Sequence, residues 1–232
     1  MNELLLLLTV VLYFSAPLVA EKLFGKAGLY AWIIIGSIWM NIELTKLVDS
    51  FGVEMALGNV LFSSTFLCTD ILSEKYGKRD SRTAALLGSF AIVSALVVSQ
   101  IMLAFQPSAF DVAQGSMETI FTQMPRLAIA SFVTYFAVQL HDVWLYHKIW
   151  SFTEKRFGKE RFLWLRNCGS TIASQALNAI VFNLIAWTGV YSIETIMSIT
   201  VASFILTAVL ALLDTPFVYI SRCFVKAPKL AD

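Results

Sequence analysis

The chain has 232 residues, of which 58% are hydrophobic and 14% are charged. Soluble domains carry about 25% charged residues, and a soluble core of this chain length cannot bury so much apolar surface. The composition therefore excludes a soluble enzyme, a disordered protein and a disulfide-rich secreted domain. The formal net charge of +1 gives no indication of a nucleic-acid partner. The three cysteines have neither metal-site nor CxxC spacing, and we interpret them as packing residues.

Seven apolar segments, each long enough to cross a bilayer, follow one another along the chain. They cover residues 4–20, 28–45, 53–73, 83–106, 124–146, 169–188 and 195–221. The first segment lacks the positive start of a signal peptide, so we interpret it as a retained membrane helix. Residues 107–123 contain no Lys or Arg and are interpreted as a solvated outer loop, with a partly structured external lid as the alternative. No linker interrupts the pattern, which predicts one all-α integral membrane domain over 1–232, a bundle of about seven transmembrane helices.

The basic residues give this bundle an orientation. All but Lys46 and Arg126 of the 17 Lys and Arg residues follow the first, third, fifth or seventh segment. Because cytoplasmic loops of membrane proteins are enriched in Lys and Arg, the N-terminus is predicted outside and the C-terminus in the cytoplasm.

Ionisable and amide side chains inside the predicted spans are the candidate functional residues, because such groups are costly in hydrocarbon. Asn41 and Thr45 share one face of the second span. Asp70 and Glu74 are four residues apart on the third, so a cation or a shared proton must offset their repulsion. Basic residues at 75–82 or a ligand cation are the partners considered. For Glu74, a purely structural salt bridge stays open as an alternative.

The fifth and sixth spans each carry a polar face. The fifth has a stripe of Ser131, Tyr135, Gln139 and Asp142, and the sixth has Thr171, Gln175 and Asn178 on one face. A polar stripe cannot face lipid, so each must line a cavity or another helix. Amide groups both donate and accept hydrogen bonds, as recognition of a heterocycle requires. Phe182 lies close enough to stack on a flat ligand, although packing is the commoner role of such a ring.

Catalytic and metal-binding motifs are absent from the sequence. It contains no Walker A loop, no HExxH, no GxSxG and no Cys/His cluster with metal spacing. Asp214 precedes Thr215-Pro216, where proline interrupts the backbone hydrogen bonds of the helix. We favour a structural cap for Asp214, with a role along a transport path as the alternative. The pattern favours a binding or transport protein with no catalytic residues, no cofactor and no metal.

Several of these polar segments together resemble the bacterial queuosine precursor transporter family, also called vitamin-uptake-like transporters. The resemblance runs from about residue 25 to about residue 190. The matching segments are Asn41 to Lys46, Phe66-Leu67-Cys68-Thr69-Asp70, Glu74-Lys75-Tyr76-Gly77, Pro125-Arg126, Ala130-Ser131, Gln139-Leu140-His141-Asp142-Val143-Trp144, Leu163-Trp164-Leu165-Arg166-Asn167, Ser170-Thr171 and Gln175 to Phe182.

The resemblance implies a six-helix family core preceded by one extra helix, located in the bacterial inner membrane. It implies import of a deazaguanine precursor of the tRNA base queuosine: the cyano or aminomethyl base, queuine or its nucleoside. The family's polar positions fall on Asn41, Asp70, Glu74, Arg126, Gln139, Asp142, Ser170 and Gln175. Many members carry Asp where this chain has Asn178, which leaves the exact ligand open.

Residues and resemblance together give the predicted substrate-binding set. It comprises Asn41, Asp70, Glu74, Arg126, Tyr135, Gln139, Asp142, Thr171, Gln175, Asn178 and Phe182. The predicted mechanism is alternating access around a pocket near the bilayer midplane. The alternative is a substrate-binding membrane subunit of an ATP-driven importer. The energy source, a partner ATPase module and a homodimer stay open.

Overall fold

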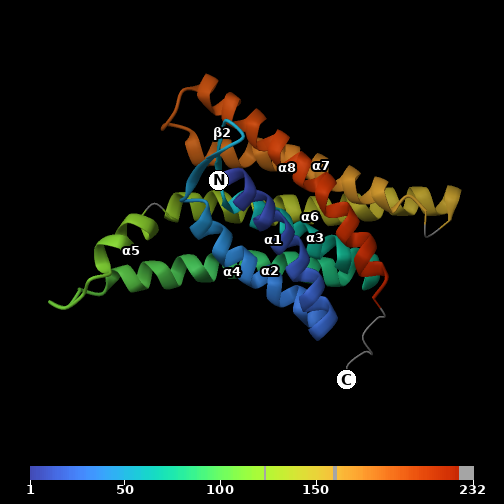
Figure 1. Ribbon diagram of the computed structural model, residues 1–232, viewed down its shortest axis with the longest axis horizontal. Coiled ribbons are helices and arrows are strands. Elements are labelled where there is room, and N and C mark those ends of the chain that lie inside the picture. Colours follow the sequence, from blue (N-terminus) through green and yellow to red (C-terminus); the bar gives the residue numbers. More distant parts are fainter. Residues whose placement is uncertain (123, 159–160, 225–232) are drawn as a thin grey trace.

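The fold is a bundle of seven long helices with a short eighth helix and a β-hairpin at one end (Figure 1). The computed structural model describes residues 1–122, 124–158 and 161–224, and every count of helices, strands or contacts refers to those residues. The helices are α1 (Asn2–Phe24), α2 (Lys26–Glu43), α3 (Gly58–Lys75), α4 (Lys78–Ala104), α5 (Gln114–Phe121), α6 (Met124–Phe157), α7 (Leu163–Trp187) and α8 (Ile193–Arg222). The predicted all-α membrane fold is confirmed.

Five of the helices are long and apolar enough to cross a bilayer: α1, α4, α6, α7 and α8. The two remaining long helices, α2 and α3, have 18 residues each. Helix α3 is surrounded by other helices, and every residue from Val60 to Ser73 on it is buried. Its side chains therefore face protein rather than lipid, which explains why it tolerates so many polar residues.

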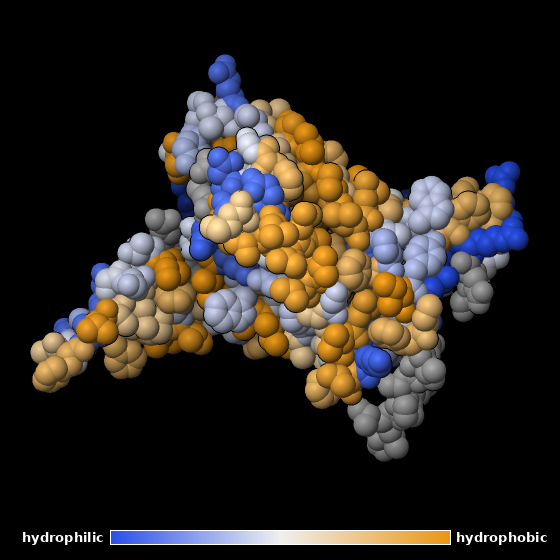
Figure 2. Space-filling view, viewed as in Figure 1, coloured by the Kyte–Doolittle hydropathy of each residue, from blue (hydrophilic) through white to orange (hydrophobic). Residues whose placement is uncertain are grey.

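Successive long helices run in opposite directions. Figure 1 shows the α1–α2, α3–α4 and α6–α7 turns near the same end of the bundle as the last turn of α8. Figure 2 shows hydrophobic side chains across the middle of the viewed face, over α1 and α8, with hydrophilic ones mainly toward its edges. Leu5, Leu12 and Leu212 are more than half exposed, as expected for side chains that contact lipid.

A β-hairpin stands where the sequence predicted the beginning of the third span. Strands β1 (Leu47–Ser50) and β2 (Val53–Ala56) pair antiparallel, and α3 begins at Gly58 rather than at residue 53. Phe51 and Gly52 both have positive φ angles, 55° and 72°, which is the backbone of a tight two-residue hairpin turn. Asn2 donates a hydrogen bond of 2.8 Å to the Asp49 carbonyl and ties the hairpin to α1.

The segment at 107–123 was expected to be a solvated loop, but it contains helix α5. Asp111 accepts hydrogen bonds from the backbone N–H groups of Ala113 (2.7 Å) and Gln114 (3.2 Å). These contacts satisfy donors at the beginning of the helix, as an N-terminal cap does. Sequence periodicity missed α5 because its eight residues are too few to establish a pattern.

Helices α1 and α2 approach closely at Gly28. A Cβ atom built on Gly28 would lie 2.1 Å from the Ala20 carbonyl oxygen, which belongs to the backbone and cannot rotate away. We expect Gly28→Ala to separate the two helices and to lower stability by about 1–3 kcal/mol. Thermal unfolding in detergent micelles measures the effect. Gly115→Ala is the control, because that position has open space around it; equal melting curves for the two variants would contradict the prediction.

Candidate functional site

A cleft opens where the ends of α2 and α3 meet α6 and α7, at the end of the bundle where α2 ends and α3 begins. Its empty volume of about 340 Å³ includes solvent at its open mouth. Its lining residues are Met40, Leu44, Gly58, Asn59, Phe62, Ser131, Thr134, Asn178 and Phe182. Asn178 and Phe182, both from the predicted substrate-binding set, therefore lie on its wall.

The polar groups of this cleft are partly unpaired. Asn178 Nδ2 donates to Gln175 Oε1 at 3.3 Å. Gln175 is fully buried, and its Nε2 has no partner among the described residues. The hydroxyl oxygens of Ser131 and Thr134 are buried and equally unpartnered within the same ranges. Each unsatisfied buried polar group costs about 1–3 kcal/mol, so a ligand that pairs with them gains affinity.

Three aspartates lie deeper in the bundle, and we call them the acidic layer: Asp70 on α3, Asp142 on α6 and Asp214 on α8. Each is at most 1% exposed. Thr171 donates to Asp70 Oδ2 at 3.2 Å, and Asn167 donates to Asp214 Oδ1 at 2.9 Å. Asp142 faces Asp70 and the α7 residues Ser170, Thr171 and Ser174.

The acidic layer continues the polar path of the cleft inward. On α6, Asp142 lies eight residues beyond the cleft residue Thr134, about two helical turns or 12 Å. On α7, Thr171 lies one turn below Gln175, which in turn contacts Asn178. The predicted face of Thr171, Gln175 and Asn178 thus runs from the cleft to the carboxyl groups.

No Lys or Arg in the described part of the chain forms an ion pair with the acidic layer. The aspartates interact electrostatically with one another across three helices. Since an ionised carboxylate inside a protein costs several kcal/mol without a partner, three such charges cannot coexist there uncompensated. Within the described ranges, no group of three acidic, Cys or His residues is placed to hold a metal ion.

Tyr135 and Gln139, the middle of the predicted α6 stripe, pack against protein. Gln139 accepts from Thr69 at 3.1 Å and donates to Thr65 at 3.3 Å, which ties α6 to α3. Tyr135 is fully buried with its ring edge-on to Phe62, and it fills the space beside Gly88 on α4. Both residues therefore hold the helices that carry the cleft, and direct contact with substrate stays a prediction.

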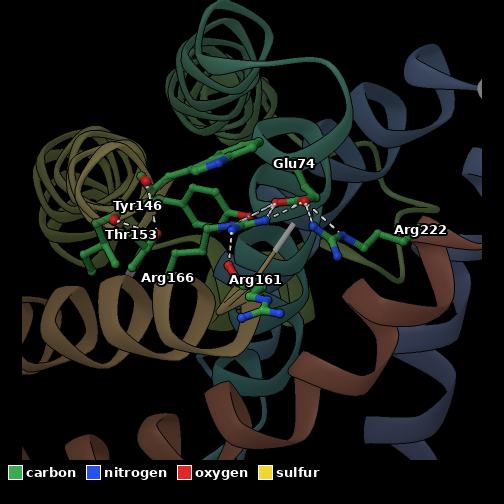
Figure 3. Close-up of polar contacts among 8 residues, drawn as sticks. Glu74, Tyr146, Thr153, Arg161, Arg166 and Arg222 are labelled. Carbon is green, nitrogen blue, oxygen red and sulfur yellow. Dashed lines mark hydrogen bonds and ion pairs between the residues drawn. The ribbon is translucent and has the colours of Figure 1, made fainter. Parts of the chain in front are cut away.

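Glu74 lies at the end of the bundle opposite the cleft in an ion-pair cluster, which we call the inner cluster after the predicted orientation (Figure 3). Its carboxylate accepts from Arg166 Nη2 at 2.7 Å, from Tyr146 Oη at 2.6 Å and from Arg222 Nε at 2.9 Å. The Arg166 side chain is fully buried, and the Glu74 side chain is 5% exposed. The guanidinium of Arg166 also lies 4.3 Å from the centre of the Trp150 ring. This geometry corresponds to the structural salt bridge that the sequence left open for Glu74.

A second ion pair lies beside the inner cluster. Lys75 Nζ lies 2.6 Å from Glu21 Oε1, and Ser221 donates to the other oxygen of Glu21 at 2.6 Å. Lys75 also donates to the Ser221 carbonyl at 3.0 Å. Together the two sets of contacts join α1, α3, α6, α7 and α8 at the inner end, so the bundle is closed below the acidic layer.

Two further predicted site residues lie away from the cleft. Asn41 donates to the Ser37 carbonyl at 2.9 Å and lines a separate, largely apolar groove between α2 and α4 with an empty volume of about 850 Å³. Arg126 is exposed and donates to the carbonyls of Ile185 and Thr188, which joins the beginning of α6 to the end of α7. Substrate contact by either residue stays a prediction.

Sequence reasoning missed several residues that the fold brings to this region. Phe62 and Thr134 line the cleft, and apolar periodicity gave no reason to separate Phe62 from lipid-facing rings. Ser131, which also lines it, belongs to the polar stripe that the sequence predicted to face a cavity or another helix. Asp214 does not cap a broken helix, because α8 continues through Pro216. Its proximity to Asp142 had no sequence signal, since the two residues belong to different helices.

Comparison with known proteins identifies the family and a full-length relative. Residues 56–221 match the family described as "Putative vitamin uptake transporter". The chain is 34% identical to the "Probable queuosine precursor transporter" of Bacillus subtilis (strain 168) over 212 aligned residues. The alignment covers 91% of this chain and 91% of the relative. No solved structure matches the chain. With a family match over most of its length and an all-helical fold, the chain belongs to the vitamin uptake transporter family and is a membrane transporter rather than an enzyme.

Proposed function

We propose that this protein imports a queuosine precursor, a 7-deazaguanine base, through the cleft that α6 and α7 form with the ends of α2 and α3. The observation that carries the proposal is the polar face of α7, where Asn178 contacts Gln175 and, one turn further in, Thr171 donates to Asp70. Such a polar face on a membrane helix is costly unless it serves a polar solute. The similarity to the Bacillus subtilis protein supports the substrate class.

The cleft suits a flat ring with hydrogen-bonding edges. Phe62 and Phe182 on its wall supply apolar faces for stacking. The amides of Gln175 and Asn178 pair with the ring's donors and acceptors. Asp142 lies about 12 Å deeper on α6 than the cleft residue Thr134. Its two carboxylate oxygens have no hydrogen-bond partner among the described residues, so they accept two parallel N–H groups from the guanidine-like edge once the base has moved inward from the cleft.

Transport in this proposal follows alternating access around the cleft. The cleft lies toward the end of the bundle predicted to face outside, while the inner cluster closes the other end. The orientation rests on the described basic residues near the inner turns, such as Lys78, Arg156 and Arg222. Lys159, Lys226 and Lys229, which also enter that prediction, lie outside the described residues.

Uptake of labelled 7-cyano-7-deazaguanine in bacteria that lack their own importer tests the proposed function. We expect Phe182→Ala and Asn178→Ala to reduce uptake about 10-fold or more, because each removes a ligand contact worth roughly 1–2 kcal/mol. Gln114→Ala on α5 is the matched control, since its amide contacts Glu118 outside the cleft. Wild-type protein at equal expression that moves no deazapurine would refute the proposal.

Purified protein in liposomes separates a self-sufficient carrier from a subunit of an ATP-driven importer. We expect equilibration of the labelled base across the membrane without ATP or any other protein. Transport only after addition of an ATPase complex would favour the subunit instead.

A further inference from the structure

The acidic layer lacks hydrogen-bond donors rather than acceptors. In the described part of the chain, four of its buried oxygens have no hydrogen-bond partner: Asp70 Oδ1, Asp142 Oδ1, Asp142 Oδ2 and Asp214 Oδ2. The fully buried Asn167 donates its Nδ2 to Asp214, and its own Oδ1 is also unpartnered within those ranges. Two of the hydroxyls that face Asp142 donate elsewhere, Ser170 to the Asn167 carbonyl and Thr171 to Asp70. Buried acceptors without donors indicate that the missing partners carry hydrogen.

The charges around the layer do not fill this deficit. Lys75 is paired with Glu21, and Arg166 and Arg222 both form ion pairs with Glu74. The thiols Cys68 on α3 and Cys168 on α7 and the phenol Tyr146 on α6 also interact with the layer. These three groups are neutral or negative when they titrate, so none of them offsets the carboxylates. The imidazole of His141 contacts Ser174 Oγ at 2.9 Å and forms no ion pair with the layer among the described residues.

The three carboxyl groups are not equivalent. Asp70 and Asp214 each have one oxygen held by a hydrogen bond, from Thr171 and Asn167 respectively, and one oxygen without a partner among the described residues. Each therefore has room for one proton on its second oxygen. Asp142 has two oxygens that are unpartnered within those ranges, the arrangement that accepts two parallel N–H donors when the group is ionised.

We propose that the acidic layer is the binding site of a co-transported proton, held by Asp70 and Asp214. The inference rests on the proposed import function and adds that a proton gradient drives that import. Three neighbouring buried carboxylates repel one another, so a proton bound at Asp70 or Asp214 makes an ionised Asp142 less costly. The ionised Asp142 then binds the N–H edge of the incoming base. Proton and substrate thus bind cooperatively from the outside, which makes the protein a proton symporter.

Proteoliposomes with an imposed pH gradient test the proposal, with labelled 7-cyano-7-deazaguanine as the probe. We expect wild-type protein to accumulate the base at least 10-fold above equilibrium, and a protonophore to abolish the accumulation. Asp70→Asn and Asp214→Asn imitate the protonated groups, so they should still exchange labelled for unlabelled base but lose accumulation. Asp142→Asn should lose both. Glu118→Gln, which removes an exposed carboxylate on α5, is the control.

Two transport results would overturn the proton site. Undiminished accumulation by Asp70→Asn and Asp214→Asn, or accumulation driven by a sodium gradient instead of a pH gradient, would contradict it while leaving the import function intact. Wild-type protein that neither exchanges nor accumulates the base would contradict the proposed function instead.

A measurement without substrate tests the proton site separately from the import function. Infrared spectra of the purified protein near neutral pH should contain a band from a buried protonated carboxyl group, weakened in Asp70→Asn or Asp214→Asn. Absence of that band from the wild-type protein would overturn the proton site whatever the substrate is. Size-exclusion profiles and melting curves establish that the variants are folded.

Discussion

Replacing Glu74 with alanine is expected to destabilise the protein by about 3–5 kcal/mol, among the largest effects that a single substitution can have in this bundle. Arg166 is fully buried, and Glu74 supplies its carboxylate partner at 2.7 Å. Without Glu74, the guanidinium stays buried beside Trp150 and Tyr146 and loses this carboxylate. Arg222 loses the same partner. Thermal or denaturant unfolding in micelles measures the loss.

A double-mutant cycle identifies the cause of that destabilisation. Arg166→Met removes the cation, so Glu74→Gln combined with Arg166→Met should cost clearly less than the sum of the two single variants. Glu118→Gln on α5 removes an exposed carboxylate and should change stability by about 0.5 kcal/mol or less. Additive single and double variants would show that Glu74 and Arg166 do not stabilise each other.

Asn178→Asp is expected to change substrate preference. A carboxylate at the cleft wall forms a charge-assisted hydrogen bond with the ammonium group of the aminomethyl base, whereas the neutral cyano group gains nothing. The difference corresponds to about 10–100-fold in relative affinity. Gln175 Oε1 accepts from Asn178 at 3.3 Å, and Gln175 Nε2 has no partner among the described residues. Rotation of the Gln175 amide therefore turns this donor toward the new carboxylate.

Competition of the unlabelled aminomethyl and cyano bases against labelled substrate measures this preference. Gln114→Glu on α5 is the control, because it adds the same negative charge outside the cleft. An unchanged ratio of the two inhibition constants in Asn178→Asp would place Asn178 away from the ligand.

The sequence predicted the long helices well because the bilayer imposes their length and composition. Each of the seven expected spans corresponds to one long helix, and the ends differ by a few residues in most of them. The hairpin at 47–56 was missed because its residues are apolar enough to extend the hydrophobic run of α3. Phe51 and Gly52 define the turn through their backbone angles, and a hydropathy pattern carries no information about such angles.

The site was predicted only in part, because contacts between distant helices decide the role of each polar residue. The spacing of Thr171, Gln175 and Asn178 correctly indicated one polar face. The neighbours of Glu74 in sequence suggested that its partners lie at residues 75–82, yet the structure pairs it with Arg166 and Arg222, 92 and 148 positions away. No local pattern separates a carboxylate in such a cluster from one in a cleft.

The contacts that close the inner end also impose an order on biogenesis. Glu21 on the first helix accepts a hydrogen bond from Ser221 on the last helix, 200 positions later. Glu74 accepts one from Arg222 in the same final turn. Since helices enter the membrane in the order of their synthesis, Glu21 can pair with Lys75 and Glu74 with Arg166 before α8 is inserted. A truncation before residue 221 would leave the contacts from Ser221 and Arg222 unmade, so the last turn of α8 completes this end of the bundle.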